Sequence, residues 1–270
     1  MTVSRRVAFG AAALPLALAA TRQAQAQSAG ASTLDTIIKR GTLIVGTSLG
    51  SPPYGITDAQ MQPDGYDVGI AKLLAREIGA KLEIVDIVAA NRIPSLTTGK
   101  VDIVISSFSI TAERAKAIAF TNCCYLDQQV AFGQKDVKIT GNEDLKGKHI
   151  GVTRSTTNDI AVTRRAPEGT VIQRYDDDAA TNQALLAGQI QAMVTSGGLV
   201  SAMRDRKTAI PLEFKYVVSE APMGIGVRHG DADLLHWLNT ALFMLWTNRE
   251  IQPLQQKWMG AVNTELPRYS

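Results

Sequence analysis

Short β-rich runs alternate with helical patterns along this chain, and the alternation occurs twice. In the first series, strands are predicted at 43–45, 82–85 and 102–105, separated by helical patterns at 68–78 and 93–96. In the second series, strands at 150–153, 171–172 and 191–194 are separated by helical patterns at 158–165 and 182–187. Because this alternation is typical of a parallel α/β sheet, the chain is predicted to form two α/β lobes.

Two extended segments lie where the chain would cross between these lobes. The first covers residues 128–133, and the second, which returns, covers 224–227 ahead of a long leucine-rich helix. The predicted boundaries are therefore 27–130 and 224–270 for lobe 1 and 131–223 for lobe 2. Two lobes joined by two crossings leave a cleft between them, and ligands favour such clefts.

Residues 1–26 have the features of an export signal. Arg5 and Arg6 precede an apolar run at 7–20, and residues 24–26 supply the small-x-small pattern of a cleavage site. The run is shorter than the roughly 20 residues that cross a bilayer. The paired arginines suggest the twin-arginine route, and an ordinary secretion signal is the alternative. Both routes predict a soluble periplasmic protein.

Charge and cysteine content exclude other classes of protein. The chain has 28 basic and 25 acidic residues. Three of the basic residues lie in the predicted leader, so the mature chain lacks the basic surplus of a nucleic-acid-binding protein. The two cysteines, Cys123 and Cys124, are neighbours, and they are either packing residues or a strained, redox-active pair. The three histidines are not clustered, so neither a metal nor a cofactor is expected.

A hydroxyl-rich loop follows the predicted strand at 102–105. It carries Ser107 and Ser109 and leads into a helix that Thr111 would cap, with Arg114 in the first turn. Ligands of α/β sheets bind beyond the carboxyl ends of strands, and a planar guanidinium suits a carboxylate. The loop is therefore a candidate anion site. The alternative is a surface arginine that pairs with a nearby carboxylate.

The second lobe repeats this arrangement after the strand at 150–153. Thr156 and Asp159 have the spacing of a capping box at a helix start. The free N–H groups there offer an anion site, and plain helix capping is the alternative reading. Together, the two loops predict one carboxylate that is held from both lobes, so that binding closes the cleft.

Several short motifs occur together in the predicted mature chain. They are GYDV at 65–68, SFSITAER at 107–114, IAFT at 118–121, DLKGK at 144–148 and KWMG at 257–260. In this combination, over nearly all of residues 33–260, the chain resembles the periplasmic polar amino-acid-binding proteins of ABC importers, bacterial extracellular solute-binding proteins of family 3. The resemblance implies a two-lobed α/β periplasmic-binding-protein fold of type II with two crossing hinge strands. It also implies a monomer that delivers its ligand to an inner-membrane ABC permease.

The resemblance assigns roles to the residues of the two loops. Arg114 would grip the ligand α-carboxylate, and Ser107 and Ser109 would contribute a backbone group and a hydroxyl. From lobe 2, Thr157 and the N–H groups beside Thr156 would close on the same carboxylate.

At Ser196 the sequence departs from this family. An aspartate that pairs with the ligand α-ammonium is usual at this position, whereas Ser196 is neutral. A buried ammonium without a carboxylate partner is costly. Either another acid holds the amine or the ligand has no amine. The acids nearby are those at 176–178, with Asp178 as the candidate, and a solvated loop is the alternative for this run.

The predicted side-chain pocket gives a clue to the ligand. Residues 90–94 (ANRIP) resemble the segment by which glutamate- and aspartate-binding members place an arginine on the second carboxylate. Arg92 would then select acidic ligands, or else it packs along the cleft rim. Ser48 stands where such proteins can carry a second arginine, and Ser51 where binders of basic residues stack a tyrosine. Tyr54 either lines the cleft or packs in the lobe core.

Two functions follow from this reading. The leading one is capture of a small carboxylate without chemistry, the ligand being a polar or acidic amino acid such as glutamate or aspartate. The alternative is an enzyme like the periplasmic cyclohexadienyl dehydratases, which act on prephenate or arogenate on the same scaffold. The segments predicted to line the cleft carry few carboxylates and no catalytic triad, so no catalytic residue is assigned.

Overall fold

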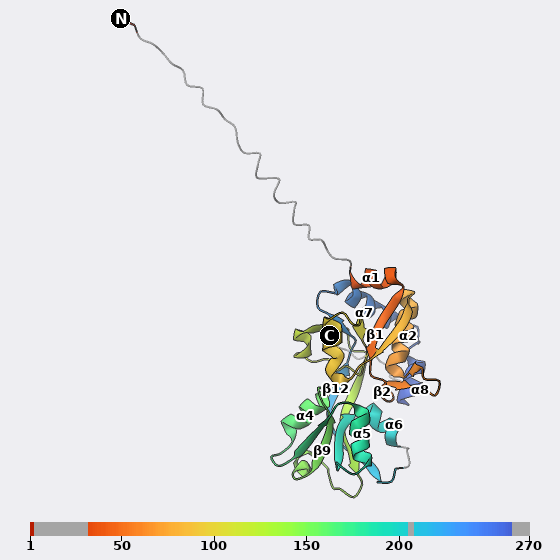
Figure 1. Ribbon diagram of the computed structural model, residues 1–270, viewed down its shortest axis with the longest axis vertical. Helices are drawn as coiled ribbons and strands as arrows, with labels where there is room; N and C mark the ends of the chain where they lie inside the picture. Colours follow the sequence, from red (N-terminus) through yellow and green to blue (C-terminus); the bar gives the residue numbers. More distant parts are fainter. Residues whose placement is uncertain (3–31, 205–207, 261–270) are drawn as a thin grey trace. The chain divides into compact units, whose positions relative to one another are not determined.

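The computed structural model describes residues 1–2, 32–204 and 208–260, and two five-stranded sheets organise the part from Ser32 onward (Figure 1). The predicted leader at 1–26 lies outside the described residues apart from Met1 and Thr2. We call the part built on each sheet a lobe. None of the helices in the described ranges has the length and apolar character needed to cross a membrane.

The sheet of lobe 1 has the strand order β5-β1-β6-β13-β7. β1 (Thr42–Thr47) lies parallel to β5 (Lys81–Asp86) and β6 (Ile103–Val104), as the alternation predicted. β13 (Gly226–Arg228) runs antiparallel between β6 and β7 (Ile118–Phe120), so the sheet is mixed. The remaining elements of this lobe are β2 (Gly50–Ser51), β3 (Gly55–Thr57), β4 (Pro63–Asp64), α1 (Thr33–Arg40), α2 (Tyr66–Ile78), η1 (Ala89–Asn91), α3 (Arg92–Thr97), η2 (Arg114–Lys116), α7 (Ala232–Thr247) and α8 (Gln252–Met259).

The core of lobe 1 combines residues from the segments that precede and follow lobe 2 in the sequence. In α7, leucines recur at helical spacing, so they form one apolar stripe. Leu234, Leu238 and Leu242 are buried in one cluster with Leu74 of α2 and Val45 of β1. Figure 1 accordingly shows the blue α7 beside the orange β1 and α2.

The sheet of lobe 2 has the strand order β10-β9-β11-β8-β12. β9 (His149–Thr153) is parallel to β10 (Val171–Tyr175) and β11 (Ala192–Ser196), and β11 is antiparallel to β8 (Tyr125–Gln134). The helical elements of this lobe are η3 (Asn142–Leu145), α4 (Thr157–Arg165), α5 (Asp178–Leu186) and α6 (Gly197–Arg204). As in lobe 1, the carboxyl ends of the parallel strands lead into loops and helix starts that line the site.

Two long strands connect the lobes. β8 pairs antiparallel with β12 (Leu212–Met223) along its length, from Tyr125↔Met223 to Gln134↔Leu212. Tyr125 and Met223 belong to the core of lobe 1, whereas Phe132 belongs to a core of lobe 2. The first predicted crossing is therefore confirmed within β8.

The returning crossing lies earlier than predicted. It is β12, which ends at Met223, and the predicted segment 224–227 contains the start of β13 inside the sheet of lobe 1. The physical reason is the position of each segment. β12 is an edge strand on which apolar residues such as Phe214 and Val217 are exposed, so it shows no regular alternation of polar and buried apolar residues.

The helix predicted after Thr111 is wrong. Only the 3₁₀ turn η2 forms, because β7 begins two residues after it and leaves no room for a helix. The predicted cap bond is present, since the Arg114 N–H donates to Thr111 Oγ1 at 3.1 Å. Arg114 therefore lies in a single turn and has no helix dipole beside it.

The neighbouring cysteines are free thiols. Cys123 is buried, and its Sγ donates to the carbonyl oxygen of Tyr125 at 3.1 Å. Cys124 is half-buried against the core of lobe 1. This matches the prediction of packing residues and not that of a bonded pair.

Candidate functional site

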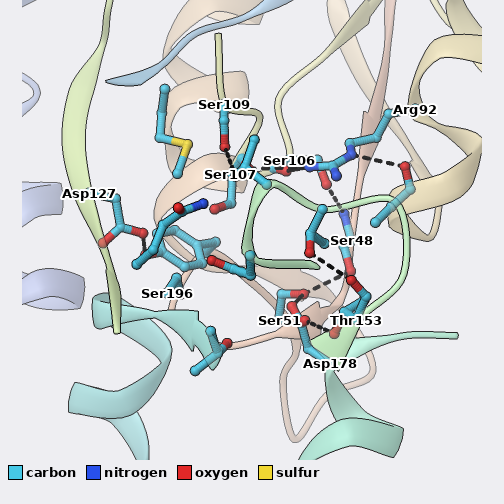
Figure 2. Close-up of a pocket in the computed structure, with 18 of the residues that line it drawn as sticks. Ser48, Ser51, Arg92, Ser106, Ser107, Ser109, Asp127, Thr153, Asp178 and Ser196 are labelled. Atoms are coloured by element: carbon cyan, nitrogen blue, oxygen red, sulfur yellow. Dashed lines mark hydrogen bonds between the residues drawn. The ribbon is translucent and has the colours of Figure 1, made fainter. Parts of the chain in front are cut away.

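A polar pocket lies where loops of the two lobes meet (Figure 2). Its empty space is about 620 Å³ when the open mouth is counted. Its lining comes from both lobes and from the crossing strands: Ser48, Ser51, Tyr54, Ala89, Arg92, Ser106, Ser107, Ser109, Asp127, Gln128, Gln129, Thr153, Thr156, Thr157, Asn158, Asp177, Asp178, Thr195, Ser196 and Met223.

The lobe 1 loop after β6 is held in an unusual backbone conformation. Ser107 has φ +42°, a left-handed value that few side chains adopt. Its N–H donates to the carboxylate of Asp67 at 2.6 Å. Asp67 is 1% exposed, and burial raises its pKa to about 7, although the bond from Ser107 acts in the opposite direction. Asp67 thus holds the loop in position through the hydrogen bond from its main chain.

The lobe 2 loop between β9 and α4 has a matching feature. Ser155 has φ +61°. Thr156 caps α4, since its Oγ1 accepts the Asp159 N–H at 3.2 Å, and its own hydroxyl donates to the Thr153 carbonyl at 2.6 Å. The hydroxyls of Thr157 and Ser109 lie 2.9 Å apart, so the two loops are joined by a hydrogen bond between the lobes.

Two arginines lie at this junction, and their N–H groups bond to main-chain carbonyls. Arg92 donates to the carbonyls of Ala89, Ser106, Ser107 and Ser155 at 3.1–3.3 Å. Arg114 donates to those of Ser109 at 2.8 Å and Ser155 at 3.0 Å. Burial, followed by the nearby charge of Arg114, lowers the pKa of Arg92 to about 9, and burial lowers that of Arg114 to about 10. Both remain cations at neutral pH.

The predicted alternative of a surface ion pair for Arg114 is excluded. Of the nearby carboxylates, Glu113 pairs with Lys116 at 2.6 Å, and Asp102 pairs with Arg40. Within the described ranges, neither Arg92 nor Arg114 forms an ion pair with a carboxylate. The junction therefore holds two cations without a bonded counter-ion.

Asp178 contributes a carboxylate on another side of the pocket. It accepts hydrogen bonds from the hydroxyl of Ser51 in lobe 1 at 2.5 Å and from that of Thr153 in lobe 2 at 2.6 Å (Figure 2). The Ser51 hydroxyl lies 3.0 Å from that of Ser48. A carboxylate has about four lone-pair positions, so these two bonds leave room for further donors.

Asp127 is a second pocket carboxylate, which the sequence reading missed. It lies on the crossing strand β8, and its Oδ2 accepts the Tyr54 hydroxyl at 2.5 Å. Burial raises its pKa, while bonds from Tyr54 and from the N–H groups of Gln128, Gly198 and Gly197 lower it. These four donors occupy the lone pairs of the carboxylate.

Ser196 belongs to the same group of side chains. Its hydroxyl is hydrogen-bonded to Tyr54, whose pKa is raised first by burial and then by the charge of Asp127. Tyr54 is 2% exposed and also stacks on Tyr125, so it both lines the pocket and packs in the lobe core. Figure 2 shows Asp127 and Asp178 on different sides of the pocket.

The structure brings together most of the residues that the sequence pointed to. The predicted residues that line the pocket are Ser48, Ser51, Tyr54, Arg92, Ser107, Ser109, Thr156, Thr157, Asp178 and Ser196. Arg114 lies just outside the lining, against Ser109 and Ser155. Asp127 was missed, although an aspartate next to the predicted crossing at 128–133 was a usable signal. In the described part of the chain, no group of three or more His, Cys, Asp or Glu side chains could hold a metal ion.

Comparisons with known proteins place the chain in a family. The family model "Bacterial extracellular solute-binding proteins, family 3" matches residues 43–261. The glutamine-binding protein of Geobacillus stearothermophilus is 32% identical over 74% of this chain and 77% of its own length. ABC transporter arginine-binding protein 1 of Escherichia coli is 29% identical over 79% of this chain and 88% of its own length.

A solved structure shares the fold. It is the ancestral amino acid-binding protein AncCDT-1, described as a precursor of cyclohexadienyl dehydratase, with a TM-score of 0.77 and 34% identity over 84% of this chain and 99% of that chain. The type II periplasmic-binding-protein fold expected from the motifs is therefore confirmed. The chain belongs to the bacterial extracellular solute-binding proteins of family 3, the amino-acid-binding proteins of ABC transporters.

Proposed function

We propose that this protein captures a zwitterionic α-amino acid with a polar side chain and delivers it to an ABC permease. The observation that carries the proposal is the charge arrangement of the pocket. Two cations without a bonded carboxylate lie at the junction of the two loops, and Asp178, with room for more donors, lies elsewhere in the lining. A zwitterion complements both.

The carboxylate of the ligand would lie at the junction of the loops. Ser109 and Thr157 approach each other there from opposite lobes, and Thr157 is the first residue of α4, where a helix has N–H groups without partners inside the helix. Arg114 lies behind Ser109, and it would lend its charge and offer the carboxylate the N–H groups that do not bond to Ser109 and Ser155. An anion would also offset the repulsion between Arg114 and Arg92.

The ammonium of the ligand would bind at Asp178. The family position for this contact is the neutral Ser196, so another acid must supply the charge. Asp127 is linked to Ser196 through Tyr54, which is hydrogen-bonded to both. However, four donors of the protein occupy the lone pairs of Asp127. Asp178 is bound by two hydroxyls, which a stronger ammonium donor could displace or join. This argument favours an amino acid over an amine-free acid.

The dehydratase alternative has less support. Asp127 is a pocket carboxyl with a raised pKa, which suits a general acid. However, its oxygens already accept hydrogen bonds from four donors of the protein, which leaves them little capacity to contact a substrate. Both named relatives are binding proteins, and we therefore propose no catalytic role.

We also propose that the chain is exported to the periplasm and works there as a monomer. The proposal rests on the leader pattern at 1–26 and on the extracellular character of the family. A change of the paired arginines to lysines distinguishes the routes, because it should block export only if the twin-arginine pathway is used.

The test of the ligand is thermal unfolding of purified protein that has been stripped of ligand by refolding. The panel holds glutamine, glutamate, aspartate, histidine, 2-oxoglutarate, succinate and prephenate. A ligand at about 100 times its dissociation constant adds roughly 2.7 kcal/mol of stability, which shifts Tm by several degrees. We expect shifts with amino acids only. A shift with prephenate alone would favour the enzyme, and a shift with amine-free acids alone would contradict the zwitterion.

A further inference from the structure

Most of the N–H groups of the Arg92 guanidinium bond to the protein itself. The guanidinium has five N–H groups, and it makes four bonds to main-chain carbonyls. Three of these carbonyls belong to lobe 1, at Ala89, Ser106 and Ser107. The fourth, that of Ser155, belongs to lobe 2. With 5% of its surface exposed, the side chain spans the junction between the lobes.

Arg114 converges on the same point. Its guanidinium donates to the Ser155 carbonyl at 3.0 Å, while Arg92 does so at 3.3 Å. Both guanidinium carbons lie over the ring of Phe108, at 4.7 Å for Arg92 and 4.9 Å for Arg114. The ring of lobe 1 thus holds two cations in place for one acceptor of lobe 2.

The acceptor is well placed to control the site. Ser155 adopts φ +61°, and it precedes the cap Thr156 and the first helical residue Thr157. The position of its carbonyl therefore fixes the turn that presents the lobe 2 ligand groups. By contrast, Arg154, one residue earlier, forms an exposed ion pair with Asp176 at 3.0 Å within lobe 2.

We propose that Arg92, together with Arg114, latches the closed cleft through the Ser155 carbonyl. Arg92 is then a positioning residue that raises the affinity for every ligand and leaves the choice of ligand to other groups. This inference rests on the proposed function, and it replaces the expected role of Arg92 in selecting a second carboxylate. The reason is geometric, because four of the five N–H groups bond to main-chain carbonyls and only one is left for a ligand.

The experiment compares Arg92→Met with the wild type for each ligand that binds. Calorimetry gives the affinities, stopped-flow fluorescence gives the dissociation rates, and X-ray scattering gives the radius of gyration with and without ligand. We expect every affinity to fall by the same factor, about tenfold or more. Dissociation should be faster, and the radius of gyration should be larger than in the wild type.

Two further variants make the result specific. Arg154→Met removes an arginine from the same turn without touching the junction, and it should behave like the wild type. Arg92→Lys keeps the charge but reaches fewer carbonyls, so an intermediate loss is expected, and it serves if Arg92→Met does not fold. A loss confined to dicarboxylic ligands, or unchanged affinity and scattering, would overturn the latch. If the wild type binds none of the ligands, the proposed function fails, and the scattering comparison still tests the latch.

Discussion

The two parts of the pocket are built in different ways. At the junction of the loops, most of the groups come from two short stretches, residues 106–114 and 153–159, with Arg92 added from α3, and many of the contacts involve the main chain. At Asp178 and Asp127, side-chain carboxylates bond to partners that are 127 and 73 residues away in the sequence. The first arrangement is local and was visible in the motifs. The second depends on the completed fold.

The largest effect is expected from Arg114→Ala, which removes the charge behind the loop junction. Affinity for every ligand should fall by about 100-fold or more, because a charge-assisted bond to a desolvated carboxylate is lost together with the contact to Ser155. Calorimetric titration measures the change. Lys116→Ala is the control, since Lys116 is exposed and pairs only with Glu113 among the described residues. Retained binding in Arg114→Ala would mean that the carboxylate binds elsewhere.

The next effect separates the two parts of the pocket. Asp178→Asn keeps the shape and removes the negative charge; its single amide oxygen accepts from one of the two hydroxyls, of Ser51 or Thr153, and the other hydroxyl can turn to accept from the amide NH2. Amino acids should bind roughly 30-fold more weakly, while their 2-oxo analogues should lose little, because the penalty falls on the ammonium. Asp176→Asn, at an exposed position, is the matched control. Equal losses for both ligand types would show that Asp178 does not face the amine.

A smaller effect tests whether Asp127 is structural. Tyr54→Phe removes the buried hydroxyl that donates to Asp127, and it should reduce the free energy of unfolding by about 1–2 kcal/mol. Denaturant unfolding measures this loss. The preference for amino acids over 2-oxo acids should stay the same. A changed preference would indicate that the ammonium of the ligand binds to Asp127 and not to Asp178.

A pH-dependent effect on stability concerns the carboxyl of Asp67 beneath the lobe 1 loop. Its pKa is about 7 in the folded protein against 3.8 as the ordinary value, so between these pH values the folded state retains a proton that the unfolded state has lost. This group therefore makes the protein less stable as pH rises from about 4 to about 7. Asp67→Asn should remove that contribution, and the difference between the two proteins in unfolding free energy against pH measures it. Parallel curves would rule out titration of Asp67.

Local periodicity was enough to predict the two lobes, because buried strands and amphipathic helices each produce a recognisable pattern of apolar residues over a short stretch of sequence. It misplaced the returning crossing, since β12 is an edge strand with exposed apolar residues such as Phe214 and Val217, while 224–227 contains the start of an inner strand. A helix near Arg114 was also predicted, with Thr111 as its capping residue. The start of β7 so soon after Arg114 and the hydrogen bonds from Arg114 to the Ser109 and Ser155 carbonyls could not be predicted from the sequence.

The candidate site was predictable to the same extent. Ser107, Ser109 and Thr157 were found because each lies directly after a strand, where α/β proteins bind ligands. The roles of Asp127 and Arg92 were not, since their partners come from distant segments. Tyr54 and Gly197 both donate hydrogen bonds to Asp127, and Arg92 donates one to the carbonyl of Ser155. These bonds join segments that are far apart in the sequence.

The most direct test of the two-part pocket is a calorimetric titration of ligand-stripped wild-type protein with a matched pair. The pair is the amino acid that gives the largest thermal shift and the 2-oxo acid with the same side chain. Because the two differ only at the amine, the account predicts that the amino acid binds at least about 30-fold more tightly. Equal affinities would contradict it, since the carboxylate part alone would then account for recognition.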